Sequence, residues 1–391
     1  MTSRFDHVEN RKGTNSMKWD GVDKLYGGND LWPMWVADMD FKAPSEVITA
    51  VQKEVNRGIF GYPIRSASVD SAVQSWLKRR FSWEIDTEHL VYTSGVVPAI
   101  AQLIKRFTEP GDKVIIQPPV YYPFFKVVTN QERQLIENPL VYDGIHYRMD
   151  FDHLKSVIDE KTKILLLCSP HNPVGRVWTI SELEQLAEIC IEHDLLVISD
   201  EIHSDMVFKG HRHVPTASLS DEMKQRTITC MAPSKTFNLA GLQTSYTIIS
   251  NPTLRRQFKN YLSGEFLNMF HSIGAVAMEA AYNEGEEWLE EFLHYLHENV
   301  RYVTSYVREH MPKIKVIQPE GTYLLWMDCT ELGMTAQERK DWLTNQAKVA
   351  LSNGIVFGKE GEPFERMNLA CSRESVIEGL TRLKKAYDEL S

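Results

Sequence analysis

The chain has 391 residues, enough for two or three ordinary domains or for one large α/β domain with a smaller companion. Hydrophobic residues make up 43% and charged residues 25%, a composition typical of a globular protein, which excludes disordered and fibrous architectures. The net charge is −10 and no long basic run is present, so we expect no nucleic acid partner.

The cysteines predict neither disulfides nor a metal site. They are five in number, lie far apart and form no CxxC pair, which indicates reduced and mostly buried thiols. The N-terminal stretch is polar throughout, and nothing later approaches the roughly 18 apolar residues that a membrane span needs. We therefore expect a cytoplasmic protein without membrane association.

From about residue 87 onward, short apolar runs alternate with amphipathic stretches, the pattern of a largely parallel sheet covered by helices. Strands are predicted at 90–92, 114–116, 164–167, 195–198, 227–230 and 247–249. A helix is predicted over 181–193, with Ser181 as its N-cap. Because ligands of such sheets bind at the carboxyl ends of the strands, the chemistry is expected there.

After about residue 285 the pattern changes to a long charged helix over 286–311, an apolar run at 323–326 and a helix from residue 374. This predicts a second, smaller α+β domain. We expect an N-terminal segment over 1–45 that belongs partly to the small domain and the substrate cleft, a large domain over 46–285 and the small domain over 286–391. Without repeats or a low-complexity linker, the domains are expected to share a cleft.

Lys235 lies in MAPSKTFNLAGLQ, directly after the predicted strand 227–230. A lysine in such a place is usually a solvated surface residue. Partial burial at a strand end would instead lower its pKa and allow its amine to attack a carbonyl. The aldehyde most often bound in this way is pyridoxal 5′-phosphate (PLP), which would need further partners.

Four other strand ends carry residues suited to such a cofactor. Asp200 could pair with the pyridine nitrogen or cap a helix, and Asn172 could bind the phenolic oxygen or form a plain Asn-Pro turn. The turn at Gly95 precedes a predicted helix start that could bind phosphate. Tyr121 or Tyr122 could stack on the ring or pack in the core.

The joint order of these features resembles that of one family. A Gly turn, an aromatic, Asn-Pro-x-Gly, a strand-ending Asp and Ser-Lys follow one another as in the fold type I PLP enzymes, the aspartate aminotransferase superfamily. The stretches GTNSMKWD, LWPMWVADMDF, DEIHSDMVF and APSKTFNLAGLQ resemble its branch of cystathionine β-lyases and cysteine C–S lyases, the MalY/PatB group. The resemblance implies a three-layer α/β fold with a mostly parallel seven-stranded sheet and a smaller α+β domain.

The resemblance also implies roles for single residues. Lys235 would form the Schiff base with PLP and move the proton at the substrate Cα. Asp200 would pair with the pyridine nitrogen, Asn172 would bind the phenolic oxygen, and Tyr121 would stack on the ring. Either Lys235 or Tyr121 would protonate the leaving thiolate.

The phosphate would be bound by the turn at Gly95, through the backbone N–H groups of Val96 and Val97, with help from Ser234. Tyr62 would reach the phosphate and substrate of the neighbouring subunit, which implies a homodimer with shared active sites.

Arg373 in NLACSRES would bind the substrate α-carboxylate, and the backbone near Ala37 would be a second contact of that carboxylate.

Two positions depart from the transaminase pattern. His203 lies at a cofactor-binding position where transaminases commonly have a tyrosine, and Gln243 lies where they have an arginine that binds the phosphate. A neutral glutamine predicts a phosphate held by N–H groups, a helix dipole and hydroxyls.

Both departures favour a PLP-dependent carbon–sulfur β-lyase. Its substrate would be a small sulfur amino acid, L-cystathionine and also L-cysteine or another cysteine S-conjugate, cleaved to pyruvate, ammonia and a thiol. An aminotransferase using the same residues stays an alternative, as does a lyase with a second, regulatory role in binding a protein.

Overall fold

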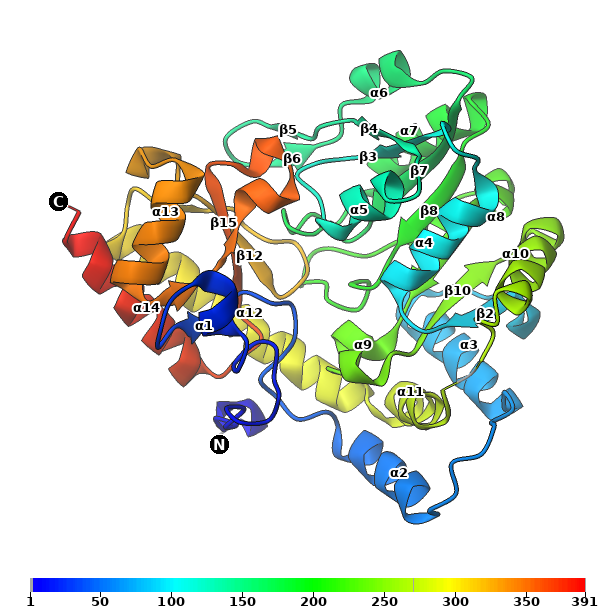
Figure 1. Cartoon of the computed structure of the whole chain (residues 1–391), viewed down its shortest axis with the longest axis horizontal. Helices are drawn as coiled ribbons and strands as arrows, with labels where there is room; N and C mark the ends of the chain where they lie inside the picture. Colours follow the sequence, from blue (N-terminus) through cyan, green and yellow to red (C-terminus); the bar gives the residue numbers. More distant parts are fainter. Residues whose placement is uncertain (1–2, 270, 391) are drawn as a thin grey trace.

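A computed structural model describes residues 3–269 and 271–390, and its centre is a seven-stranded sheet in the order β2-β10-β9-β8-β7-β3-β4 (Figure 1). Only β10 runs antiparallel to its neighbours. In chain order the strands are β2 (Leu90–Thr93), β3 (Lys113–Ile116), β4 (Gln134–Glu137), β7 (Thr162–Cys168), β8 (Leu196–Asp200), β9 (Thr227–Met231) and β10 (Ser245–Ile249). The carboxyl ends of β2, β7, β8 and β9 therefore meet at one edge.

The sheet is buried on both faces because successive side chains of each strand point to opposite sides. In β7, Ile164 and Leu166 pack in the same apolar cluster as Ile100 of the helix α4. Leu165 and Leu167 pack in another cluster, with Leu183 of α7. Helices on both faces make the three layers that the resemblance implied, and the predicted fold class is confirmed.

The helices of this larger part cover both sheet faces. They are α2 (Ser45–Asn56), α3 (Ala67–Phe81), α4 (Val96–Phe107), α5 (Pro123–Thr129), α6 (Phe151–Val157), α7 (Ile180–Glu192), α8 (Asp221–Arg226), α9 (Pro233–Thr236), α10 (Pro252–Gly264) and α11 (Ser272–Glu284). A small hairpin joins β5 (Val141–Tyr142) to β6 (Tyr147–Arg148). On one face α11 packs against α2 and α3, while α4 lies over β2, β8, β9 and β10 on the other.

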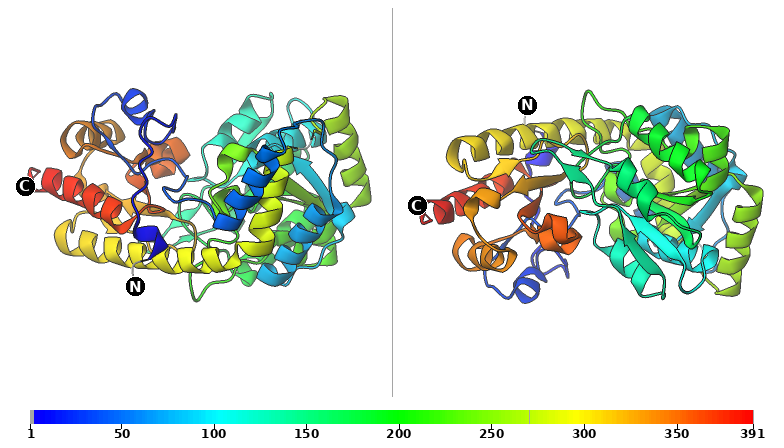
Figure 2. Two further views of the ribbon diagram at one scale, coloured as in Figure 1. Left: turned by 90° about the horizontal axis from the view of Figure 1, so that it is seen from below. Right: turned by 90° about the horizontal axis from the view of Figure 1, so that it is seen from above.

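A smaller domain is built on a four-stranded antiparallel sheet in the order β11-β12-β15-β14. Its elements are β11 (Lys315–Val316), β12 (Leu324–Asp328), α13 (Ala336–Trp342), β13 (Val349–Ala350), β14 (Ser352–Asn353), β15 (Phe364–Asn368) and α14 (Arg373–Asp388). The long helix α12 (Glu286–His310) runs from the larger part to the smaller one and packs against α14 (Figure 2).

The N-terminal segment packs on the smaller domain. It contains α1 (Val22–Tyr26) and β1 (Trp32–Pro33), and β1 pairs in parallel with β13. Through this pairing the described N-terminal residues lie beside the smaller domain (Figure 1). The domain boundaries at residues 45 and 285 stay a prediction.

All six strands predicted from the apolar runs are present, and two local expectations need correction. The helix over 181–193 begins one residue earlier, and its N-cap is Thr179, not Ser181, because Thr179 forms a capping box with Glu182. The seventh strand, β4, was not predicted from its sequence because its residues are only half buried at the sheet edge. The described part of the chain has no helix long and apolar enough to cross a membrane.

Candidate active site

Two adjoining cavities lie at the carboxyl edge of the large sheet, where it faces the smaller domain. The inner cavity has a volume of about 200 Å³ and the outer one about 490 Å³. Ala37, Tyr121 and Lys235 line both, so Lys235 stands at the junction. The inner cavity is lined by most of the residues predicted to bind the cofactor, namely Gly95, Val96, Val97, Tyr121, Asn172, Asp200, His203, Ser234 and Lys235.

Lys235 lies on α9, the short helix that follows β9, with Pro233 in its first turn. Its Nζ donates a hydrogen bond of 2.6 Å to the carbonyl oxygen of Ala37. Burial lowers its pKa from 10.5 to about 8, with Arg366 adding to the effect and the carboxylates of Asp38 and Asp200 opposing it. A fraction of the amine is thus neutral near pH 7, as a nucleophile and general base requires.

Asp200 is the last residue of β8 and is buried at the inner cavity. Burial raises the pKa of its carboxyl to about 7, although the N–H of Ile202, at 3.2 Å, and the charge of Lys235 lower it. Because burial destabilises the ionised form of this carboxyl, a cationic or N–H group that enters the cavity would stabilise it strongly.

The turn after β2 and the start of α4 form a cradle for an anion. Gly95 has φ 154° and ψ 156°, a backbone conformation that is nearly exclusive to glycine. The N–H groups of Val96 and Val97 open the first turn of this helix of 12 residues, where they have no partner within the helix. Hydroxyl residues complete the lining: Ser94, Ser234 and Thr244.

Gln243 also lines this cavity, and Lys235 is its only Lys or Arg among the described residues. The reliance of the phosphate on N–H groups, a helix dipole and hydroxyls stays a prediction, and the cavity lining contains groups of all three kinds.

Asn172 follows β7 in the turn that contains the cis peptide bond to Pro173. Its Oδ1 accepts a hydrogen bond of 2.9 Å from Nη1 of Arg366. His203 is buried, its ring meets that of Tyr323 edge-on, and its Nδ1 has no partner among the described residues. Burial lowers the pKa of His203 to about 3, so this imidazole is neutral.

The structure does not bring Arg373 to either cavity, contrary to the expectation that it binds the substrate carboxylate. Arg373 begins α14, donates from Nε to Asn299 at 2.8 Å, and lies over the ring of Tyr302. Its side chain is therefore engaged between α12 and α14. The arginine at the site is Arg366 of β15, which sequence reasoning missed.

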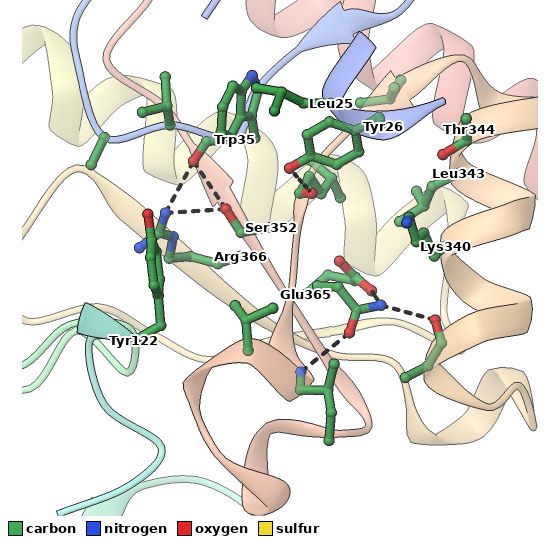
Figure 3. Close-up of a pocket in the computed structure, with 18 of the residues that line it drawn as sticks. Leu25, Tyr26, Trp35, Tyr122, Lys340, Leu343, Thr344, Ser352, Glu365 and Arg366 are labelled. Carbon is green, nitrogen blue, oxygen red and sulfur yellow. Dashed lines mark hydrogen bonds between the residues drawn. The ribbon is translucent and has the colours of Figure 1, made fainter. Parts of the chain in front are cut away.

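Arg366 is buried at the wall of the outer cavity (Figure 3). Its Nη2 donates to the carbonyl oxygen of Trp35 at 3.0 Å and to Oγ of Ser352 at 3.1 Å. Its Nε is buried without a partner among the described residues. A guanidinium with an unused N–H in a cavity is suited to bind a carboxylate.

The segment over 35–38 is held between the two domains. Asn368 donates to the carbonyl oxygens of Val36 and Asp38, both at 2.6 Å, and Tyr323 donates to that of Ala37 at 3.1 Å. The carbonyl of Ala37 thus accepts from both Lys235 and Tyr323. The prediction that this segment lines the substrate side agrees with its place at the outer cavity.

Tyr62 lies apart from both cavities and is 92% exposed. The side chains around it are also exposed and apolar: Ile59, Phe60 and Ile64 in the same loop, and Phe266 and Met269 in the loop after α10. Tyr62 and Met269 line a common surface hollow, so the two loops adjoin. In this chain alone, Tyr62 completes no site.

A family model for aminotransferase class I and II matches residues 34–383. The chain belongs to this family. Cystathionine beta-lyase PatB of Bacillus subtilis is 40% identical over 383 residues, which cover 98% of this chain and 99% of the relative. Aspartate aminotransferase of the same organism is 27% identical over 376 residues, 93% of each chain.

Solved structures of PLP-bound proteins are similar over the whole chain. A protein of Clostridium difficile 630, assigned only provisionally as an aminotransferase, has a TM-score of 0.96 and 45% identity, covering 98% of this chain and 99% of that one. The PLP-bound C–S lyase of Staphylococcus hominis has a TM-score of 0.91 and 33% identity, covering 99% and 98%. The family is PLP-dependent.

The residues that line the inner cavity fit PLP independently of the similarity to other proteins. Donors for a phosphate lie at the start of α4, the buried carboxyl of Asp200 can meet the pyridine nitrogen, and the amine of Lys235 is placed to meet the aldehyde. The unpartnered Nδ1 of His203 is a further polar atom that a bound ligand can satisfy.

Proposed function

We propose that this protein is a PLP-dependent carbon–sulfur β-lyase that cleaves L-cystathionine, and also L-cysteine or another cysteine S-conjugate, by α,β-elimination. The position of Lys235 carries the proposal. Its amine, with a lowered pKa, stands where the inner cavity meets an outer cavity that has Arg366 in its wall. The similarity to PatB and to the C–S lyase of Staphylococcus hominis supports the choice of lyase.

In this proposal Gly95, Val96, Val97 and Ser234 hold the phosphate of PLP, Asp200 pairs with its pyridine nitrogen, and Asn172 binds its phenolic oxygen. Tyr121, which lines the same cavity, covers the ring. When bound, PLP supplies an electron sink for the pair released as the substrate Cα–H bond breaks. The buried carboxylate of Asp200 keeps the pyridine nitrogen protonated.

Arg366 and Lys235 act on the substrate. Arg366, not Arg373, binds the α-carboxylate, and the bonds from Arg366 to Trp35 and Ser352 fix the plane of its guanidinium. Lys235 removes the Cα proton as general base, and burial favours its neutral form. The burial of Lys235 and Arg366 lowers the local dielectric constant and strengthens these contacts.

The elimination balances without an oxidant or reductant. The Cα proton passes to Nζ of Lys235, and the Cβ–S bond breaks with its electron pair on sulfur. The thiolate takes a proton from the ammonium of Lys235 or from Tyr121 and leaves as homocysteine, or as hydrogen sulfide from cysteine. The released aminoacrylate takes up water and yields pyruvate and ammonia.

The proposal includes a homodimer in which Tyr62 enters the phosphate and substrate site of the neighbouring subunit. Its support is the exposed apolar surface formed by the loops at 59–64 and 266–269, which a monomer would leave in water. The domain boundaries at 45 and 285 belong to the same proposal.

An aminotransferase is the second candidate, and the 27% identity to aspartate aminotransferase over 93% of both chains favours it. One experiment separates the two. The purified protein is given L-cystathionine or L-cysteine without a keto acid, and pyruvate and thiol are measured. We expect many turnovers per subunit. Conversion of the cofactor to its amine form, with turnover only after a keto acid is added, would establish the aminotransferase.

The assignment of the lysine has its own test. Borohydride reduction followed by peptide mapping is expected to fix the cofactor on Lys235. The variant Lys235→Ala is expected to keep the wild-type circular dichroism spectrum and to lose turnover by about a thousandfold or more. Full activity of this variant would show that another lysine acts.

A further inference from the structure

The outer cavity extends well beyond the contacts that an α-amino acid needs at Lys235 and Arg366. Its volume of about 490 Å³ lies within the range of sites for drug-sized ligands and exceeds what a three-carbon amino acid fills. The part that lies opposite Arg366 in Figure 3 is lined by residues of α1, α13 and the turn after it, and β15. We call this part the distal arm and define it by Leu25, Tyr26, Lys340, Leu343, Thr344 and Glu365.

The walls of the distal arm are mostly apolar, from Leu25 on α1, Leu343 after α13, and Val349 and Leu351 around β13. Tyr26 stands between the two ends of the cavity, with its hydroxyl bonded to the carbonyl oxygen of Leu351 at 2.7 Å. Burial and Glu365 raise the pKa of Tyr26 while Arg366 lowers it, so both charges lie near this hydroxyl. The distal arm is thus continuous with the region of Arg366.

Glu365 supplies an unused acceptor. Its Oε1 accepts from Nε of Arg339 at 2.8 Å and from Nδ2 of Asn353 at 3.1 Å. Its Oε2 is buried and has no partner among the described residues, although the side chain is only 2% exposed. In Figure 3 the carboxylate points into the space between Tyr26 and Lys340. A buried carboxylate oxygen without a donor is costly, and a ligand N–H would satisfy it.

Thr344 and Lys340 supply the complementary donors. The Oγ1 of Thr344 is buried and unpartnered within the described residues. Lys340 is half buried, and its ammonium takes part in no ion pair of the described part of the chain. One free carboxylate oxygen, one free ammonium and one free hydroxyl together match a zwitterionic head, whose ammonium and carboxylate need opposite partners.

We infer that the distal arm binds the second amino-acid head of a thioether substrate that carries one such head at each end, as L-cystathionine does. Glu365 receives its ammonium, Lys340 and Thr344 receive its carboxylate, and the apolar walls contact its methylene groups. The inference rests on the proposed lyase function and names the residues that select a two-headed substrate over L-cysteine.

The test compares two substrates in variants of the PLP-loaded enzyme. Lys340→Met, Thr344→Val and Glu365→Gln are each expected to lower the ratio of kcat/KM for L-cystathionine to kcat/KM for L-cysteine by about tenfold, mainly through KM, because each removes a charged or buried hydrogen bond to the longer substrate only. Lys385→Met, at an exposed lysine of α14, is the matched control and is expected to leave the ratio at the wild-type value.

Binding gives a second readout that is independent of turnover. In the Lys235→Ala background, titration calorimetry is expected to show about tenfold weaker binding of L-cystathionine after Lys340→Met or Thr344→Val, with the affinity for L-cysteine unchanged. If Glu365→Gln does not fold, because Arg339 loses its partner, these two variants decide the question.

The outcomes separate the inference from the proposed function. Wild-type protein that releases no pyruvate from either substrate would defeat the lyase. Wild-type turnover of both substrates, with variants that keep the wild-type ratio or lose both activities equally, would overturn the distal arm alone.

Discussion

Arg366 and Arg373 lie close in sequence and differ completely in surroundings. Arg366 has an unpartnered buried Nε at the outer cavity, whereas Arg373 is bonded to Asn299. We expect Arg366→Gln to lower kcat/KM for L-cystathionine by about a hundredfold or more, mostly through KM, because a charge-assisted carboxylate contact is lost. Arg373→Gln is the matched control and should stay within about twofold. Equal losses in steady-state kinetics would contradict the assignment.

The stretch RMNLACSR, residues 366–373, shows which site residues could be predicted from the sequence and which could not. Lys235, Asp200, Asn172 and Gly95 could be predicted because each follows a recognisable strand and carries a chemical type that PLP needs. Residue type alone could not decide whether Arg366 or Arg373 lies at the site, because both are arginines in the same stretch. What distinguishes Arg366 is its place inside the buried strand β15, where a charged residue needs a partner or a ligand.

Asp200 gives a pH-dependent prediction for the protein stripped of PLP. Burial raises its pKa from 3.8 to about 7, so between these values the folded chain holds a proton that the unfolded chain has released. The free energy of unfolding therefore falls as pH rises through this window. Asp200→Asn is expected to be more stable than the wild-type apoprotein at about pH 8, by about 1 to 4 kcal/mol, and equally stable near pH 4.

Urea denaturation of the two apoproteins at both pH values measures this difference. Saturating PLP should reverse the order by stabilising the wild type more than the variant, because only the carboxylate pairs with a protonated pyridine. An Asp200→Asn apoprotein that is less stable than wild type at the higher pH would contradict the raised pKa.

At the scale of elements, a buried ion cluster anchors the N-terminal segment under the site. Lys18, with a side chain that is 0% exposed, bonds Asp40 at 2.7 Å, and Arg11 bonds both Asp38 and Asp40 at 2.8 Å. Asp38 directly follows Ala37, whose carbonyl accepts from Lys235, and Asp40 lies two residues further on. The cluster thus fixes the strip of backbone that faces the substrate.

Lys18→Met is expected to lower the free energy of unfolding by about 3 kcal/mol, because it leaves a buried charge only partly compensated. Lys42→Met is the comparison: Lys42 pairs with Glu9 at 2.8 Å, but its side chain is 68% exposed, and the loss should be below about 1 kcal/mol. Denaturant unfolding of the PLP-loaded enzymes measures both. If both variants lost a similar free energy of unfolding, the buried ion cluster would contribute no more to stability than an exposed ion pair.

Elements with strong apolar runs were predictable, whereas those that depend on their neighbours were not. The strands β7, β8 and β9 could be predicted because both of their faces are buried, which gives their sequences nearly continuous apolar runs. The distal arm arises only where α1, near the N-terminus, packs beside α13, more than two-thirds of the chain away. No local pattern encodes that contact.

For the whole molecule, the proposed homodimer predicts rescue between two inactive variants. Lys235→Ala lacks the amine, and Tyr62→Ala lacks the side chain expected to enter the neighbouring site. Half of the dimers in an equal, fully exchanged mixture are hybrids, and each hybrid has one intact site, so about a quarter of wild-type activity should return. Pyruvate release before and after exchange measures this, and no recovery despite confirmed exchange would contradict shared sites.

The residues proposed to hold PLP follow strands of the large sheet, whereas Trp35, Arg366, Ser352 and the distal arm come from the N-terminal segment and the smaller domain. The residues proposed for the reaction and those proposed for substrate selection therefore lie in separate segments of the sequence. A mutagenesis library confined to residues 22–26, 340–344 and 352–356 can vary which thioether is accepted while the catalytic lysine and its cofactor contacts pass unchanged into every clone. Directed evolution of new sulfur substrates can begin from this division.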